Sequence, residues 1–262
     1  MIVRSADGTP ISVERIGDGP PLVVVPGALS DVASWSACAP LLADGRSALV
    51  VDRRGRGASG DAETYQVERE AEDVLAVLDE LGVPTDLLGH SSGAILALEA
   101  AERSPAHVQR LVLYEPPVFI DVEDSVPADL PERLDTLLAE GDADGALETF
   151  LREGPRTPEG EIRWLRAHTG WQRMLAMART VTYDARISQM FDPDLDRLAS
   201  METPTLMLIG SLSPPRMRKG SEAIAASLPR VQIEELEGQA HIAHQSAPDA
   251  LAAAVLRFLT AG

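Results

Sequence analysis

The chain has 262 residues, and its 41 acidic and 23 basic side chains give a formal net charge of -18 at pH 7. This charge excludes a generally basic nucleic-acid-binding surface and argues against docking to an anionic membrane face. Hydrophobic residues make up 45% of the chain and charged residues 24%, which are values typical of a globular protein. We therefore expect a globular protein that binds neither nucleic acid nor membrane.

The cysteine count and the first residues restrict the compartment. Cys38 is the single cysteine, which excludes an intramolecular disulfide and a cysteine-rich metal site. Residues 1–5 lack the apolar stretch of a signal peptide, and no apolar run approaches the ~18 residues of a membrane span. These features predict a cytoplasmic protein.

Short apolar runs alternate with helical patterns along the chain. The runs are residues 22–25, 48–51, 86–89, 111–114 and 205–209. Runs that are apolar on both faces are typical of a parallel sheet buried under helices. Helical periodicity occurs in residues 74–81, 92–103 and 249–259. This succession of strands and helices predicts an α/β fold with a doubly wound, mostly parallel sheet.

One long segment, residues 120–201, breaks this alternation. It shows helical patterns and no convincing buried strand, which predicts a helical cap between two parts of the core, residues 1–119 and 202–262. Ligand sites favour the crevice at the carboxyl ends of strands, which such a cap would cover. Four large side chains of the cap are therefore expected to border a substrate pocket: Trp164, Trp171, Met174 and Met177. The simpler interpretation is that they only hold the cap to the body.

Residues 89–93 read Gly-His-Ser-Ser-Gly and lie between a predicted strand and a predicted helix. This context is typical of a nucleophile elbow, a tight turn that projects a serine hydroxyl into the crevice. We therefore expect Ser91 to be a nucleophile. Ser92 follows it at a helix N-terminus, where its backbone N–H can stabilise an oxyanion. The alternative is an ordinary Gly/Ser-rich loop between a strand and a helix.

With this elbow, the chain resembles the α/β-hydrolase superfamily over nearly its whole length. The motifs that carry the resemblance are residues 89–93, Val-Pro-Gly-Ala at 25–28, Asp-Arg-Arg-Gly-Arg-Gly-Ala-Ser at 52–59 and Gly-Gln-Ala-His at 238–241. The resemblance implies an α/β-hydrolase fold, with the backbone N–H of Ala28 as the second oxyanion donor. Such families usually carry His-Gly where this chain has Pro26-Gly27, a departure that keeps the turn glycine. The arginines of the 52–59 loop are expected to pack the loop or to lie at its rim.

Five histidines are candidates for the general base. A last strand is predicted at residues 231–236, and His241 lies in the loop after it, where this fold delivers its base. Small residues around it leave room for the imidazole to reach Ser91. We therefore expect His241 to take the proton from Ser91 and return it to the leaving group. The other four are expected to pack beside the site, to touch substrate or to lie in solvent: His90, His107, His168 and His244.

The acid of a triad is missing from its usual place in the superfamily. That place is Ser213, and residues 203–221 contain no acidic side chain. Glu115 directly follows the preceding predicted strand, and this arrangement resembles a subgroup of haloalkane dehalogenases in which a glutamate at this strand end supports the histidine. Geometry rather than sequence position sets the roles in a triad, so we expect Glu115 to orient His241. Asp121 is the second candidate, and a dyad without an acid is the third.

A serine nucleophile indicates acyl transfer. The expected reaction is hydrolysis of a carboxylic ester, thioester or lactone with a small to medium apolar substrate. Dehalogenases and epoxide hydrolases of the superfamily carry Asp at the elbow, which argues against their chemistry here. A biosynthetic cyclase, lyase or acyltransferase using the same Ser–His pair is an alternative, as is a weakly active ligand-binding protein. The scattered histidines form no ligand cluster, so we expect neither metal nor cofactor. The oligomeric state is open.

Overall fold

One mixed sheet organises the chain. The computed structural model describes residues 1–168, 170–190 and 195–260. Within these residues the sheet has the strand order β1-β2-β4-β3-β5-β6-β7-β8. The pairs β1–β2 and β2–β4 are antiparallel, and all other neighbouring pairs are parallel. The bounds are β1 Ile2–Arg4, β2 Pro10–Ile16, β3 Pro21–Val25, β4 Ser47–Asp52, β5 Thr85–His90, β6 Val108–Tyr114, β7 Thr205–Gly210 and β8 Val231–Leu236. The mostly parallel sheet predicted from the sequence is confirmed.

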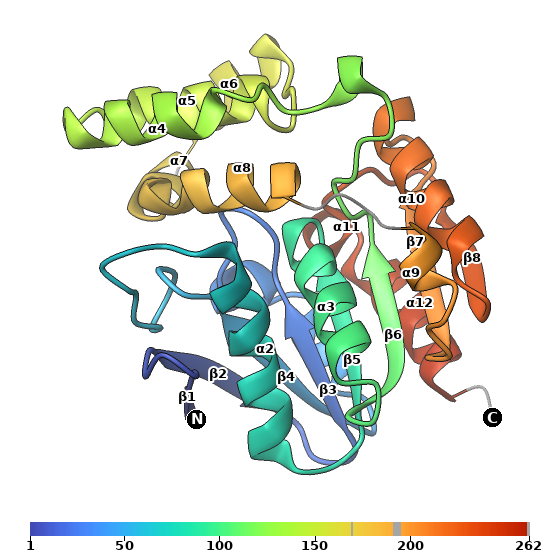
Figure 1. Ribbon diagram of the computed structural model, residues 1–262. Coiled ribbons are helices and arrows are strands. Elements are labelled where there is room, and N and C mark those ends of the chain that lie inside the picture. Colours follow the sequence, from blue (N-terminus) through green and yellow to red (C-terminus); the bar gives the residue numbers. More distant parts are fainter. Residues whose placement is uncertain (169, 191–194, 261–262) are drawn as a thin grey trace.

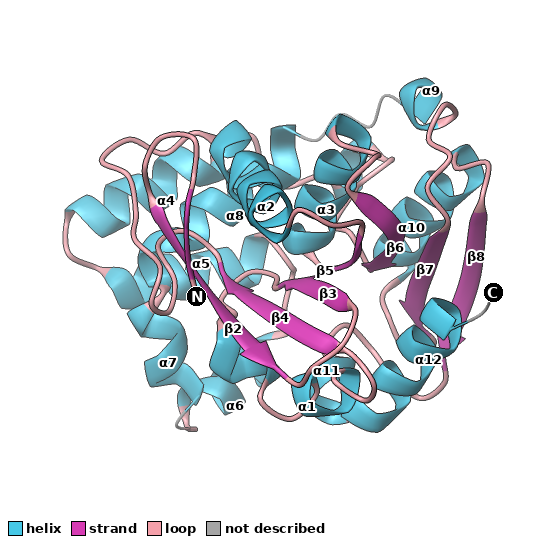
Figure 2. Cartoon of the chain, turned by 90° about the horizontal axis from the view of Figure 1, so that it is seen from below, coloured by secondary structure: helices cyan, strands magenta, loops and turns pink. Residues whose placement is uncertain are grey.

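Helices cover both faces of this sheet (Figure 1 and, from below, Figure 2). One face carries α2 Val67–Leu81, α3 Ser92–Arg103 and α10 Pro215–Ser227. The opposite face carries α1 Ala39–Leu42, α11 Ala243–Ser246 and α12 Pro248–Thr260. Among the helices of the described ranges, none is long and apolar enough to cross a membrane.

Strand side chains alternate between two hydrophobic cores. In β3, Val23 and Val25 pack in the core that includes α2 and α3, whereas Leu22 and Val24 pack in the core that includes Trp35 and α12. Both faces of the strand are therefore removed from water. This explains why the central strands appear in the sequence as continuous apolar runs instead of alternating patterns.

The chain between β6 and β7 forms a layer of helices above the strand ends (Figure 1). The described helices of this layer are α4 Leu130–Ala139, α5 Ala143–Glu153, α6 Glu159–Arg166, α7 Gly170–Ala176 and α8 Val181–Met190, whereas α9 Leu195–Leu198 packs against α10 beside the sheet. Most of them share a separate apolar cluster that includes Leu134, Leu147 and Phe150. Helix α8 belongs to both layers, because Val181 packs in that cluster and Ile187 packs in the core beneath. The domain limits at residues 119/120 and 201/202 stay a prediction.

Candidate active site

Ser91 lies at the junction of β5 and α3, in a sharp backbone turn. Its φ of 54° and ψ of -130° are strained for a residue with a side chain. The Ser91 backbone N–H donates to the Tyr114 carbonyl at 2.9 Å, which ties the turn to the neighbouring strand. A side chain at Gly93 would collide with the carbonyl oxygens of Val25 and Pro26. The turn therefore requires the glycine that the sequence supplies.

The segment that contains Ala28 lies directly against this turn. A Cβ atom on Gly27 would be 2.7 Å from the Ser91 Cβ, so only glycine permits the approach. Leu29, two residues later, has a φ of 52°, again in the left-handed region. The structure thus brings together Ser91 and the two segments expected to supply oxyanion donors, those of Ala28 and Ser92.

Glu115 begins the chain that leaves the carboxyl end of β6, and its side chain is fully buried. Its Oε2 lies 2.7 Å from His241 Nδ1, and its Oε1 accepts the Gly210 backbone N–H at 2.7 Å. Burial would raise the pKa of Glu115, but the hydrogen bonds and the charge of His241 outweigh it and hold this pKa below its usual value. Its φ of 47° adds a further strained residue at the site.

Asp121, the second candidate for the acid, lies elsewhere. Its carboxylate pairs with the Lys219 ammonium at 2.6 Å, and its side chain is 41% exposed. The structure therefore places Glu115, and not Asp121, on the imidazole of His241.

His241 follows β8 in the loop that leads to α11. Because an ionised carboxylate can only accept hydrogen bonds, the contact with Glu115 assigns the N–H to Nδ1. Nε2 is then left with its lone pair, which is the form that a general base needs. The His241 side chain is 31% exposed, so the ring is not sealed in the core.

Two other histidines form a buried floor beside His241. His90 donates from Nε2 to the His241 carbonyl at 2.8 Å, and the His244 ring stacks on Trp35 with a centroid distance of 4.7 Å. Burial holds the pKa of His90 well below its usual value, and burial with the nearby His241 lowers the pKa of His244 to about 3. Both rings are therefore neutral near pH 7. The sequence did not indicate this packing of Trp35 with His244.

The remaining two histidines lie away from the Glu115 carboxylate. His107 contacts the Ser104 hydroxyl through Nδ1 at 2.6 Å. His168 stacks on Trp164 with a centroid distance of 4.0 Å. His107 Nε2 also lies 3.8 Å from the Asp79 carboxylate, beyond hydrogen-bond distance, whereas His241 Nδ1 lies within it of Glu115.

The large side chains of the helical layer do not share one role. Trp171 is 3% exposed and packs inside the layer's own cluster, where its indole N–H donates to Asp144 at 2.8 Å. Met174 packs partly buried against the same cluster, and Trp164 is 59% exposed. The expectation that these three side chains border a substrate pocket stays a prediction. Met177 is buried outside that cluster, and its place beside a pocket stays a prediction.

The arginines of the loop after β4 are buried, which agrees with the expectation that they pack the loop and not with the alternative that they lie at its rim. Arg53, Arg54 and Arg56 are between 0% and 2% exposed. Each guanidinium is neutralised by buried carboxylates, and the nearest partners of Arg53 are Glu70 and Asp184. The sequence carried no signal for these pairs, because Arg53 and Asp184 are 131 residues apart.

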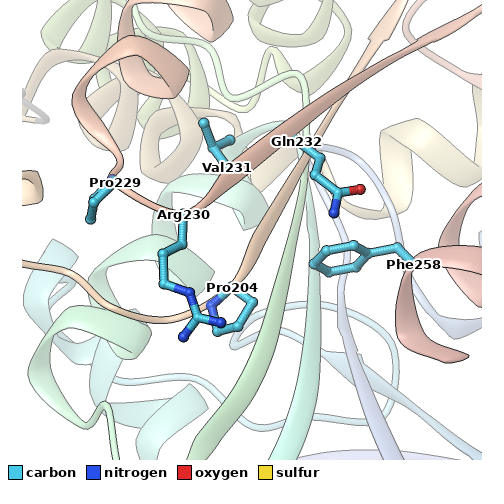
Figure 3. Close-up of a pocket in the computed structure, with 6 residues that line it drawn as sticks. All are labelled: Pro204, Pro229, Arg230, Val231, Gln232 and Phe258. Atoms are coloured by element: carbon cyan, nitrogen blue, oxygen red, sulfur yellow. The ribbon is translucent and has the colours of Figure 1, made fainter. Parts of the chain in front are cut away.

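A surface hollow of about 290 Å³ lies at the opposite end of the sheet (Figure 3). Its walls come from the amino ends of β7 and β8 and from α12: Pro204, Pro229, Arg230, Val231, Gln232 and Phe258. Ser91 and Glu115 follow the carboxyl ends of β5 and β6, so this hollow is not part of the candidate site. The described ranges also contain no group of three or more His, Cys, Asp or Glu side chains that could hold a metal ion.

Comparisons with known proteins agree with this geometry. The model of the alpha/beta hydrolase family matches residues 22–254. A solved alpha/beta hydrolase from Sphaerobacter thermophilus is 40% identical, with a TM-score of 0.91 over 99% of this chain and 100% of its own. N-formylmaleamate deformylase of Pseudomonas putida is 37% identical over 124 residues, which is 46% of this chain and 46% of the deformylase, so the match spans about half of that relative.

A further relative matches over more of its length. Pimeloyl-[acyl-carrier protein] methyl ester esterase of Aeromonas hydrophila subsp. hydrophila is 30% identical over 212 residues, which is 77% of this chain and 80% of the esterase. The family match covers most of the chain, and both the sheet and the elbow agree with it. This chain therefore belongs to the alpha/beta hydrolase family.

Proposed function

We propose that this protein hydrolyses a carboxylic ester, thioester or lactone through an acyl-enzyme on Ser91. His241 is the general base, and Glu115 orients it. The observation that carries the proposal is the 2.7 Å contact between Glu115 Oε2 and His241 Nδ1, at the strand ends from which the strained Ser91 also projects. A buried carboxylate on a histidine, beside a serine elbow, is the arrangement that serine hydrolases use.

The first half of the reaction forms the acyl-enzyme. His241 Nε2 takes the hydroxyl proton of Ser91 as Oγ attacks the carbonyl carbon. The backbone N–H groups of Ala28 and Ser92 stabilise the resulting oxyanion. The Glu115 carboxylate stabilises the imidazolium formed at His241. This proton then passes to the leaving alcohol, thiol or lactone oxygen, and the acyl group stays on Ser91.

The second half repeats these steps with water. His241 removes a proton from the water as its oxygen attacks the acyl carbon, and the same N–H groups hold the second oxyanion. Collapse returns the proton to Ser91 and releases the acid. The neutral rings of His90 and His244 do not compete for this proton, because burial holds the pKa of both below the usual range.

Relatives support a hydrolytic reaction on an acyl compound. One is named for the methyl ester of pimeloyl-[acyl-carrier protein], one for a deformylation, and a third, 25% identical over 96% of this chain, is 2-(acetamidomethylene)succinate hydrolase of Mesorhizobium japonicum. We propose a small to medium, apolar ester-like substrate for this chain, bound between the strand ends and the helical layer.

A fluorophosphonate probe tests the proposed nucleophile. We expect one adduct, on the peptide that contains Ser91, together with turnover of p-nitrophenyl acetate. Ser91→Ala should lose both, while its melting temperature stays close to that of the wild-type protein. Labelling at another residue, or turnover that survives in Ser91→Ala, would contradict the proposal.

A further inference from the structure

A buried cluster of charges lies next to the elbow. It consists of Arg53, Arg56, Glu70 and Asp184, and we call it the ion cluster. Its four side chains are between 0% and 2% exposed, and its two positive and two negative charges balance. Burying a charge costs free energy unless it is paired and hydrogen-bonded. In the ion cluster, the pairing of opposite charges offsets this desolvation penalty.

Arg53 contacts both segments that supply the proposed oxyanion donors. Its Nη1 donates to the Ser92 hydroxyl at 2.9 Å and to the Pro26 carbonyl at 3.3 Å. Its Nε and Nη2 donate to the two oxygens of Glu70 at 2.7 and 3.0 Å. The fixed fork of the guanidinium therefore joins the turn before Ala28 to the start of α3.

Asp184 brings the helical layer into the same network. It lies on α8, and its Oδ1 accepts the Ser92 hydroxyl at 2.7 Å and Arg53 Nη1 at 3.0 Å. Its Oδ2 accepts Arg56 Nη2 at 2.8 Å. Burial would raise the pKa of Asp184, but the charges of Arg56 and Arg53 and the hydrogen bond from Ser92 lower it, so the carboxylate stays charged.

The residue before Asp184 fixes α8 in the same place. The rings of Tyr183 and Tyr65 stack with a centroid distance of 3.7 Å and an interplanar angle of 5°. The Tyr65 hydroxyl donates to Glu70 at 2.9 Å, and the Tyr183 hydroxyl donates to Asp61 at 3.0 Å. Helix α8 is thus held against the loop after β4 by aromatic and ionic contacts together.

We propose that Arg53 and Asp184 are positioning residues for the oxyanion hole, so that helix α8 sets the geometry of the two backbone donors. This inference rests on the proposed function. Both side chains are 2% exposed and contact Ser92 or Pro26, so they act through the N–H groups of Ser92 and Ala28. A misplacement of about 1 Å in such a site can cost about 10²-fold in rate.

The same loop offers a matched control. Arg54 is the neighbour of Arg53, is equally buried, and also pairs with a carboxylate of α2: its Nε and Nη2 lie 2.7 Å from the oxygens of Asp73. The Arg54 guanidinium donates to Asp73, Asp7 and the Arg69 carbonyl, and not to Pro26 or Ser92. Asp73→Asn therefore removes a buried ionic partner without touching the proposed positioning contacts.

The experiment compares Asp184→Asn and Arg53→Lys with Asp73→Asn, each assayed well below its own melting temperature. We expect the first two to lose about 10- to 10²-fold in kcat for p-nitrophenyl acetate, with KM changed by less than about threefold. An alkyl boronic acid, which adds to the serine and mimics the tetrahedral intermediate, should bind more weakly by a similar factor. Asp73→Asn should keep kcat and boronic acid affinity, whatever its melting temperature.

Two results would overturn the inference. One is an unchanged kcat in both Asp184→Asn and Arg53→Lys; the other is an equal kcat loss in Asp73→Asn at an equal drop in melting temperature. If the wild-type protein neither reacts with fluorophosphonate nor hydrolyses ester, the proposed function fails separately. Hydrogen exchange then decides the positioning role: Asp184→Asn should speed exchange in the peptides containing Ala28 and Ser92 more than Asp73→Asn does, and equal exchange contradicts it.

Discussion

Two groups of residues surround Ser91, and they come from different parts of the chain. The first joins Glu115 to His241 by one contact of 2.7 Å and lies at the ends of core strands. The second is the ion cluster, which reaches Ser92 and includes Asp184 from α8. We therefore propose that proton transfer depends on residues of the core sheet, whereas oxyanion stabilisation also depends on the helical layer. Changes in the first group should therefore cost more activity than changes in the second.

The largest loss is expected for Ser91→Ala, because no covalent intermediate can form without Oγ. In a serine protease, loss of the nucleophile costs about 10⁶-fold in kcat, and we expect a loss approaching that here. Steady-state turnover of p-nitrophenyl acetate measures it. His241→Ala should be nearly as inactive, and the double variant no worse than either single one, since the two side chains act as a unit. Losses that add up in the double variant would show that Ser91 and His241 act independently.

Glu115→Gln should cost about 10⁴-fold in kcat, as loss of the orienting carboxylate does in a serine protease. The amide keeps the size of the side chain but can reverse the hydrogen bond and trap the wrong tautomer of His241. Asp121→Asn is the matched control, because this carboxylate was the other candidate and pairs with Lys219 instead. Parallel kcat measurements decide between them. Full activity in Glu115→Gln, or a comparable loss in Asp121→Asn, would contradict the proposal that Glu115 orients His241.

Ser213→Asp in the Glu115→Gln background should recover about tenfold of the lost activity. The reason is that this position follows β7, where the superfamily usually carries its acid, and triad roles are set by geometry. The double variant is compared with Glu115→Gln in the same assay. No recovery in a folded double variant would show that the loop after β7 cannot present a carboxylate to His241.

Some residues near the candidate site stand in a recognisable sequence pattern, and others do not. Ser91 could be found because glycines at fixed spacing are needed for a tight turn, and Glu115 because Ser213 left the usual position empty. The place of Glu115 beside His241 followed from topology, since the carboxyl ends of adjacent parallel strands meet at one edge. Arg53 and Asp184 could not be paired, because two charges 131 residues apart leave no periodic pattern.

In the fold, too, some elements were predictable from the sequence and others were not. The central strands were predictable from continuous apolar runs, but β1 and β2 were not. They lie at one edge of the sheet, and the burial in β2 alternates only in part, so its sequence resembles a polar loop. In the helical layer, composition identified Trp164 and Trp171 as large apolar residues. It could not show that one is at the surface and the other inside, because that depends on how the helices pack.

The contribution of Glu115 to the free energy of unfolding should depend on pH. Its pKa is lowered in the folded protein, so the folded state binds its proton less readily than the unfolded state. The stabilisation is therefore complete above the ordinary glutamate pKa of about 4.3 and is lost as the pH falls through the lower, folded value. We expect the difference in unfolding free energy between wild type and Glu115→Gln to shrink below about pH 4. Urea unfolding at several pH values measures it, and a difference that grows on acidification would contradict this sign.

The smallest effect is expected for Trp164→Ala. The side chain is 59% exposed and stacks on His168, so its loss should change the unfolding free energy by no more than about 0.5 kcal/mol. Trp171→Ala is the contrasting variant, because that indole is buried in the cap cluster and its removal should cost about 3–5 kcal/mol. Thermal unfolding of both variants provides the measurement. Equal destabilisation would contradict the assigned packing of the helical layer.

A crystal structure of the phosphonate adduct tests the central claim most directly, because it places both groups of residues around one reacted atom. We expect phosphorus on Ser91 Oγ and a phosphonyl oxygen about 2.7–3.1 Å from the backbone nitrogens of Ala28 and Ser92. We also expect that His241 Nδ1 keeps its contact with Glu115. An adduct on another residue, an oxygen turned away from both nitrogens, or an imidazole separated from Glu115 would contradict the account.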